Sequence, residues 1–276
     1  MQTANGCRLA AALGLIAALG SISLAAEDTA GQSIRPRLAA MQFHDYSAYR
    51  GHLLGRRAAD ALYVALEATG RWRLLEPSAV RQACADMHLT PPFAVGYQQA
   101  LGYRLNADVI VTGRVEGVRI SPAEGTVTIN LVLDFVDRVC GQSIMPLQIS
   151  GSSRRADGGP RPTDIIVSEA LADACSRIVA IVQTVPACAA KVVDTSGTQL
   201  TLEPLTEVPL TGGDRLLLYR ANGDEQAGPK LVALLMVKRA EAGRITATVL
   251  DRIGDIYTGD VAVCVGPARP EVKPTP

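Results

Sequence analysis

Apolar residues recur at helical and strand spacings along the first two thirds of the chain. Residues 52–70 place them three and four apart on one face, and Gly70 is suited to end this helix. Over Thr126–Val136 apolar and polar residues alternate, which is typical of a strand with one buried face. The same patterns predict further helices over 79–87, 91–105 and 163–183, and further strands over 37–43, 71–77, 108–120 and 144–151. Ser78 is positioned to cap the helix over 79–87.

This order, β-α-β-α-α-β-β-β-α, contains two crossover connections followed by a meander. It predicts a mixed β-sheet packed with helices, mainly on one face, over residues 35–185. The helical spacing is absent from Ala189 onward, where six short apolar runs are separated by turn signals such as "TGGD". These runs predict a small closed all-β barrel over residues 189–266. The predicted fold class is therefore α+β, a mixed sheet with helices followed by a small barrel.

The two ends of the chain have a different composition. Arg8 precedes an apolar run over Leu9–Leu19 and then small residues, the order of a secretory signal peptide, which we assign to residues 1–26. Ser23 and Ala25 suit a cleavage site, with Ala26 or Ala30 as alternative last residues removed. A retained anchor is the alternative, but the run is marginal for a bilayer. Residues 267–276 form a proline-rich polar tail that we expect to be disordered.

Export and charge restrict the functions that are compatible with the sequence. A cleaved signal implies a periplasmic protein, and no later segment is apolar enough to predict a transmembrane helix. The chain carries 27 basic and 27 acidic residues, so its charge gives no reason to expect nucleic acid as a partner. No nucleotide-binding, nucleophile-elbow or Cys-x-x-Cys motif occurs, so we predict no cofactor and no enzymatic activity.

Two polar groups are candidates for chemistry, each with a simpler structural interpretation. His44, Asp45 and His52 have the side chains of a metal site, but a polar loop with a helix-capping carboxylate is the favoured reading. Asp134 and Asp137 are the nearest approach to an acid–base pair. Together with Arg138 they are better read as a solvated strand face and turn, so neither group is predicted to be a catalytic or metal site.

Trp72 and an arginine-rich loop are the candidates for ligand contacts. Trp72, the single tryptophan, is predicted to anchor the core with its indole N–H hydrogen-bonded, rather than to stack on a ligand. Arg154, Arg155 and Arg161 concentrate positive charge in a loop that could grip a phosphate or an acidic partner. A solvated loop is the favoured interpretation.

Five cysteines remain after removal of the predicted signal: Cys84, Cys140, Cys175, Cys188 and Cys264. An oxidising compartment permits disulfides. Cys188 opens the first barrel strand and Cys264 lies in the last, and a closed barrel places these strands side by side. The pair is therefore the candidate disulfide. For the other three, buried thiols and a bridge both remain open.

Four segments also carry a family resemblance: "RLAAMQF", "LGRRAADALYVALEATGRWRLLEPSAV", "LGYRLNADVIVTGRVEG" and "INLVLDFVDRVCGQ". In this order they resemble the bacterial envelope domain shared by the curli-secretion CsgG family and the amino-terminal domain of TolB. The resemblance covers about Arg37–Gln183. The segments "GDRLLLYRANG" and "GDVAVCV" more loosely resemble the small carboxy-terminal barrel of flagellar assembly protein T.

The resemblance implies an envelope assembly or accessory role with protein partners, including self-association, and no cofactor. Two departures argue against a curli-type pore: no cysteine follows the signal's apolar run, and the strands over 108–151 are too short for membrane-spanning hairpins. A periplasmic binding protein for a small ligand or peptidoglycan fragment is the alternative function. An exported hydrolase built on His44, Asp45 and His52 is a third and weaker one.

Overall fold

The computed structural model describes residues 34–47, 49, 53–121, 124–153, 161–207, 209–220, 229–241 and 243–267. The predicted signal peptide, His52, and residues 268–276 of the predicted tail lie outside them. The first part of the chain forms a sheet and four helices. The strands are β1 (Arg37–Ala40), β2 (His44–Asp45), β3 (Arg73–Leu74), β4 (Val109–Ser121), β5 (Thr126–Asp137) and β6 (Ser143–Ser152). The helices are α1 (Leu53–Glu67), α2 (Pro77–Asp86), α3 (Val95–Leu105) and α4 (Thr163–Thr184).

The sheet is mixed, as the crossover connections and the meander predict. Its order is β3-β1-β4-β5-β6, with β2 paired to β4. β1 runs parallel to β3 and β4, whereas β4, β5 and β6 are antiparallel neighbours. Two predicted strands are shorter than the sequence pattern implies. Of residues 37–43 only Arg37–Ala40 form a strand, β1, with the two-residue β2 following them, and only Arg73–Leu74 of 71–77 are paired.

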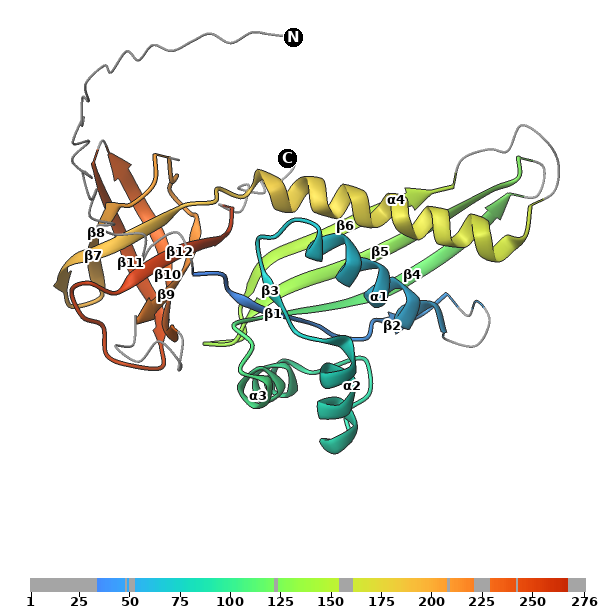
Figure 1. Cartoon of the computed structure of the whole chain (residues 1–276), viewed down its shortest axis with the longest axis horizontal. Helices are drawn as coiled ribbons and strands as arrows, with labels where there is room; N and C mark the ends of the chain where they lie inside the picture. The colour runs from blue at the N-terminus through green and yellow to red at the C-terminus, as the bar shows by residue number, and fades with distance from the viewer. Residues whose placement is uncertain are drawn as a thin grey trace, which may run out of the picture.

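Helices cover both faces of the sheet near β1, which corrects the expectation of helices mainly on one face. Leu38 and Val109 pack into the core beneath α1 and α4. The next residue along each strand, Ala39 or Ile110, points to the other face and packs against α2 and α3. Figure 1 shows α4 along one side of the long strands and α2 and α3 on the other. The physical reason is that β1 and the start of β4 carry apolar residues on both faces, which parallel strands require.

Beyond α2 and α3, the long strands have one apolar and one polar face. In β5 the predicted alternation is confirmed, since Val127, Ile129, Leu131, Leu133 and Phe135 are all buried in the core that α4 covers. At Gly151 in β6, a Cβ atom would lie 2.2 Å from the Ala170 carbonyl oxygen of α4. Glycine is therefore what allows α4 to approach this strand so closely.

β6 is an edge strand, and at two residues on its unpaired edge no backbone N–H is left for another strand. Ser153 N donates to Val127 O on the β5 side, while Ser152 N points the other way and donates to Asp173 Oδ2 of α4 at 2.9 Å. Backbone direction alternates along a strand, so Pro146 shares the outward edge with Ser152. Proline at such a position removes an outward N–H without breaking the ladder with β5.

The helix ends agree in part with the sequence signals. Gly70 adopts the left-handed φ of +61° just beyond α1, in line with its predicted role in ending the helix. The predicted cap at Ser78 is wrong. α2 begins at Pro77, a residue suited to the first helical position, and the preceding Glu76 makes no side-chain cap.

The second part of the chain is a closed barrel of six strands, as predicted. They are β7 (Ala189–Ser196), β8 (Gln199–Pro204), β9 (Arg215–Arg220), β10 (Lys230–Glu241), β11 (Arg244–Arg252) and β12 (Val261–Gly266). The barrel order is β10-β11-β8-β7-β12-β9, so the first and last strands are neighbours. Its interior is filled by aliphatic side chains such as Leu202, Leu216 and Leu235.

Candidate functional site

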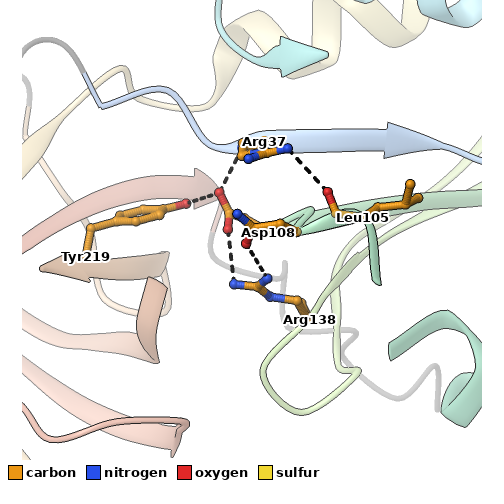
Figure 2. A network of polar contacts seen from close by, with 6 residues as sticks. Arg37, Leu105, Asp108, Arg138 and Tyr219 are labelled. Carbon is orange, nitrogen blue, oxygen red and sulfur yellow. Dashed lines mark hydrogen bonds and ion pairs between the residues drawn. The ribbon is translucent and has the colours of Figure 1, made fainter. Parts of the chain in front are cut away.

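A buried carboxylate connects the sheet to the barrel. Asp108 lies between α3 and β4 and is 5% exposed. One of its oxygens accepts hydrogen bonds from Arg37 N at 2.8 Å and from the hydroxyl of Tyr219, on barrel strand β9, at 3.1 Å. The other faces Arg138 Nη2 at 3.5 Å. Figure 2 shows these three partners converging on the one carboxylate from three separate segments.

The groups around Asp108 are themselves held in place. Arg138 donates to Asn106 Oδ1 at 2.8 Å and lies over the Tyr103 ring, 5.3 Å from its centre. Burial raises the pKa of Asp108, against the opposing effects of the Arg37 N–H, the Arg138 charge and the Tyr219 hydroxyl. Burial and the neighbouring carboxylate raise the pKa of Tyr219 well above its usual value. Tyr219 therefore stays a neutral donor at physiological pH.

A second contact between sheet and barrel is made by Arg71, in the loop between α1 and β3. Its guanidinium donates to Val185 O at 2.6 Å, Pro186 O at 2.9 Å and Cys264 O at 3.3 Å. These carbonyls belong to the segment joining α4 to β7 and to β12. One side chain of the sheet part thus holds both the entry to the barrel and its last strand.

Beside Arg71 the junction contains a cavity of about 380 Å³. It is lined from both parts of the chain, by Ile34, Arg35, Pro36, Gly70, Arg71, Trp72, Ala187, Cys188, Ala189, Thr206, Val263 and Cys264. Trp72 is 6% exposed and packs on Phe135, with ring centres 6.2 Å apart, so its predicted core role is confirmed. The predicted hydrogen bond of its indole is wrong, because among the described residues Trp72 Nε1 has no acceptor.

Cys188 and Cys264 meet at the edge of this cavity. Cys264 N donates to Cys188 O at 3.1 Å, and the Cys264 thiol donates to Gly266 O at 3.6 Å. Both are free thiols in this structure, so the disulfide stays a prediction. The Cys264 thiol and, to a smaller extent, Arg71 hold the pKa of the Cys188 thiol below its usual value, against burial and the charge of Asp214. The contact with Cys188 and burial raise the pKa of Cys264.

The loop before α1 places Asp45 in its predicted capping role. Asp45 accepts hydrogen bonds from the backbone N–H groups of Ser47 and Leu54, at 2.9 and 3.3 Å, which ties the loop to the start of α1. His44 instead makes an edge-to-face contact with Tyr46, with ring centres 4.1 Å apart. No group of three or more His, Cys, Asp and Glu side chains suited to a metal ion occurs within the part of the chain that the structure describes.

Asp137 and Arg138 are buried, which corrects the expectation of a solvated face and turn. Asp137 is fully buried and accepts from Cys140 N and Gln142 N at 2.8 and 2.7 Å, so it closes the turn before β6. Asp134 accepts instead from the hydroxyl of Ser143 at 2.6 Å. The two carboxylates serve separate turn and strand contacts.

Two further predictions concern the arginine-rich loop and the remaining cysteines. Arg161 binds Glu169 of α4, whereas Arg154 and Arg155 lie outside the described residues. Cys84, Cys140 and Cys175 are free thiols. Burial raises the pKa of Cys140 and of Cys175 to about 11, so both are unreactive at neutral pH.

Sequence reasoning missed the Asp108, Arg138 and Tyr219 cluster. In the sequence Asp108 is only the first residue of the strand predicted over 108–120, Arg138 is predicted to be solvated, and Tyr219 lies in a barrel strand far along the chain. The available signal is an acidic residue directly before a fully apolar strand, Val109–Val111. Such a group starts a buried strand and requires a partner.

Comparison with known proteins gives distant structural likenesses only. A scan against protein-family models finds no match, and a search of curated proteins finds none. The chain is similar to the PelC dodecamer from Paraburkholderia phytofirmans, with a TM-score of 0.35 and 13% identity over 54% of this chain and 93% of that one. It is also similar to the LpoB C-terminal domain from Escherichia coli (TM-score 0.33, 14% identity, 42% and 81% covered). A third likeness is to lipoprotein GNA1162 from Neisseria meningitidis, with a TM-score of 0.34 and 13% identity over 48% of this chain and 90% of that one.

These scores and identities are too low to carry an argument about fold or function. They do not confirm the resemblance to the CsgG and TolB domains or to flagellar assembly protein T. Among the described residues, no helix combines the length and apolar character needed to cross a bilayer.

Proposed function

We propose that this chain is an exported, non-enzymatic accessory protein of the bacterial cell envelope that acts through protein contacts. The observation that carries the proposal is a hollow of about 330 Å³ on the polar face of the sheet. It lies where α2 and α3 no longer cover β4 and β5, so the strands themselves form its floor. Such a face is a preformed surface on a rigid scaffold.

The side chains around the hollow suit a protein partner. Tyr46 and Phe93 stand at its rim and Arg114 and Asp134 on the strands, with Pro146 of β6 completing the wall. Tyr46 is 57% exposed, so a large amphipathic ring is available for contact. Tyrosine and arginine are the residues that most often dominate protein interfaces, because they combine large contact area with hydrogen bonding.

Site-specific crosslinking in living cells tests this proposal. A photoreactive amino acid at Tyr46 should yield a discrete adduct with an envelope protein, identified by mass spectrometry. The same probe at Tyr257, a barrel residue with a matched exposure of 55%, should not. Adding Arg114→Ala should reduce the Tyr46 adduct. Equal adducts at both positions, or none at Tyr46 in a folded and exported protein, would overturn the proposal.

Export has its own test. Cells should release the mature chain in the periplasmic fraction, with a first residue between Ala26 and Gly31. A chain that keeps Arg8, or one that stays in the cytoplasm, contradicts an envelope role.

A second candidate function, binding of a small ligand, is favoured by a cavity of about 310 Å³ between α1 and α2. Its wall is mainly apolar and includes Ala59, Val80 and Phe93. At its mouth Arg56 and Arg81 share the one carboxylate of Asp60, at 3.8 and 3.3 Å. Two guanidinium groups on one carboxylate leave an excess positive charge, so the cavity suits a small carboxylate with an apolar body. A peptidoglycan fragment bears carboxylates of this kind.

Titration followed by backbone NMR separates this candidate from the first. Octanoate and muramyl dipeptide serve as charged probes, and octanol as the uncharged control. Charged probes should shift Ala59, Val80 and Cys84, and Arg81→Ala should weaken binding about tenfold, the effect of one lost charge-assisted contact. Equal shifts with octanol, or no shifts with either acid, would exclude a carboxylate site.

A further inference from the structure

The two cysteines at the junction are placed for bond formation. Val263 and Ala189 are the last assigned pair between β12 and β7, and the same register sets Cys264 opposite Cys188. Hydrogen-bonded pairs of antiparallel strands have Cα atoms about 5.5 Å apart, inside the range of about 4.4 to 6.8 Å that disulfides span. A backbone hydrogen bond from Cys264 N to Cys188 O, at 3.1 Å, holds the pair together where the ladder ends, so a small approach of the two strand ends suffices.

The surroundings make the two thiols chemically unequal. The neighbouring Cys264 thiol and, to a smaller extent, the Arg71 guanidinium lower the pKa of Cys188, so both stabilise its thiolate. Asp214 and burial act in the opposite direction. The neighbouring Cys188 and burial raise the pKa of Cys264, so its proton is held more firmly. A thiolate attacks disulfides and a thiol does not, so Cys188 is the attacking residue and Cys264 the resolving one.

The cavity supplies a route to the pair. Cys188 and Cys264 are 3% and 2% exposed, but both line the junction cavity of about 380 Å³. A small disulfide reagent fits a space of this size. Cys175 is equally buried, yet it lies on the core-facing side of α4 and lines none of the cavities described above.

We propose that Cys188 and Cys264 form a redox-active dithiol site at the junction, which exchanges with small disulfides and closes into an intramolecular disulfide. The Cys188 thiolate attacks one sulfur of an oxidant R–S–S–R, forming Cys188–S–S–R as the first R–S⁻ leaves. Cys264 then loses its proton, attacks the Cys188 sulfur and expels the second R–S⁻. Two cysteine thiols are oxidised, the oxidant is reduced to two R–SH, and the cysteines' two protons end on these groups.

Closure of the disulfide reinforces the junction. Arg71 binds the backbone on both sides of the pair, at Val185 and Pro186 before Cys188 and at Cys264 itself. The bond would fix the entry of the barrel to its last strand while Arg71 holds both against the sheet. It also closes a long loop, from 188 to 264, and long loops gain most from crosslinking. We expect the melting temperature of the oxidised chain to exceed that of the reduced chain by on the order of 10 °C.

Exchange with bis(2-hydroxyethyl) disulfide tests the site in the folded mature chain. After treatment and alkylation, mass spectrometry should show that the chain has lost two hydrogens and that two fewer cysteines are alkylated. Digestion should then give a pair of peptides joined by a disulfide between Cys188 and Cys264. Cys264→Ser should trap a mixed disulfide on Cys188, whereas Cys188→Ser should form its mixed disulfide at least tenfold more slowly. Cys175→Ser is the matched buried control and should close the bond as the unmodified chain does.

The wild-type chain alone decides the outcome if a variant fails to fold. Five thiols still open to alkylation after unfolding of the treated chain would overturn the proposal. So would a linkage between other cysteines, or equal melting temperatures of the oxidised and reduced forms.

Discussion

The junction between sheet and barrel has two halves that are built in opposite ways. Immediately around Asp108 a carboxylate, two arginines and a tyrosine fill the space, and both carboxylate oxygens have donors. A cavity of about 510 Å³ lies farther out, lined by Arg138, Tyr103 and Leu231 among others. Around Trp72 the junction keeps a cavity, an indole N–H without an acceptor among the described residues, and two cysteines joined by a backbone hydrogen bond. The residues that orient the barrel against the sheet therefore lie apart from the residues that can react. The filled half sets how the barrel sits, and the hollow half leaves reactive groups within reach.

The largest effect should come from removing the carboxylate of the filled half. Asp108→Ala leaves Arg138 and Tyr219 buried without their shared partner, and breaking a buried pair in this way costs about 3 to 5 kcal/mol. Chemical denaturation measures the loss. Asp86→Ala is the control, because Asp86 pairs with Arg104 at the surface, and this pair should contribute at most about 1 kcal/mol. Equal losses for both variants would contradict the central role of Asp108.

A smaller loss is expected from Tyr219→Phe, which removes only the contact from the barrel. The hydroxyl donates to a charged group, and such hydrogen bonds contribute about 1.5 to 3 kcal/mol. The ring keeps its packing, so the barrel itself should stay folded. If the variant unfolds as readily as Asp108→Ala, the hydroxyl stabilises the junction by more than its one hydrogen bond explains.

The pH dependence of stability should report the same carboxylate. Because burial raises the pKa of Asp108, the folded protein binds its proton more tightly than the unfolded chain does. The stabilising contribution of this group to the free energy of unfolding is therefore fully present below about pH 4. It is lost as the pH rises through the raised pKa of the folded state. Asp108→Asn, which does not titrate, should lack this component. Parallel stability curves for the two proteins over pH 3–7, a window that spans the usual aspartate pKa, would show that Asp108 does not titrate differently on folding.

The smallest effect is expected in the hollow half. Trp72→Phe keeps an aromatic ring against Phe135 and removes an N–H that has no acceptor in the described structure. The loss of packing area and the removal of an unpaired donor oppose each other, so stability should change by less than about 1 kcal/mol. A loss above about 2 kcal/mol would indicate a hydrogen bond to ordered water in the cavity.

The sequence predicted contacts that follow from chain order and missed those that depend on three-dimensional convergence. Barrel closure alone placed Cys188 next to Cys264, because the first and last strands of a barrel must meet. Capping by Asp45 and the buried side of β5 also followed from local patterns. The Asp108 cluster could not be predicted in this way, because Tyr219 reaches it from a strand 111 positions away and no period links the two.

The covering of both sheet faces shows a different limit. Periodicity found α2 and α3 but could not say which side of β1 they occupy, since Leu38–Ala40 are apolar on both faces of the strand and suit either side. The hollow on the polar face follows from this placement, so the surface that we propose for protein contact was also not visible in the sequence.

The outward edge of β6 has a consequence for polymerisation. A strand from another copy would need consecutive N–H and C=O groups on that edge, but Pro146 offers no N–H and the N–H of Ser152 is taken by Asp173. The barrel is closed on itself and presents no such edge. Runaway, fibre-like stacking of copies through this strand is therefore disfavoured, and any assembly of several copies must use faces, whose shape limits the number that fit together.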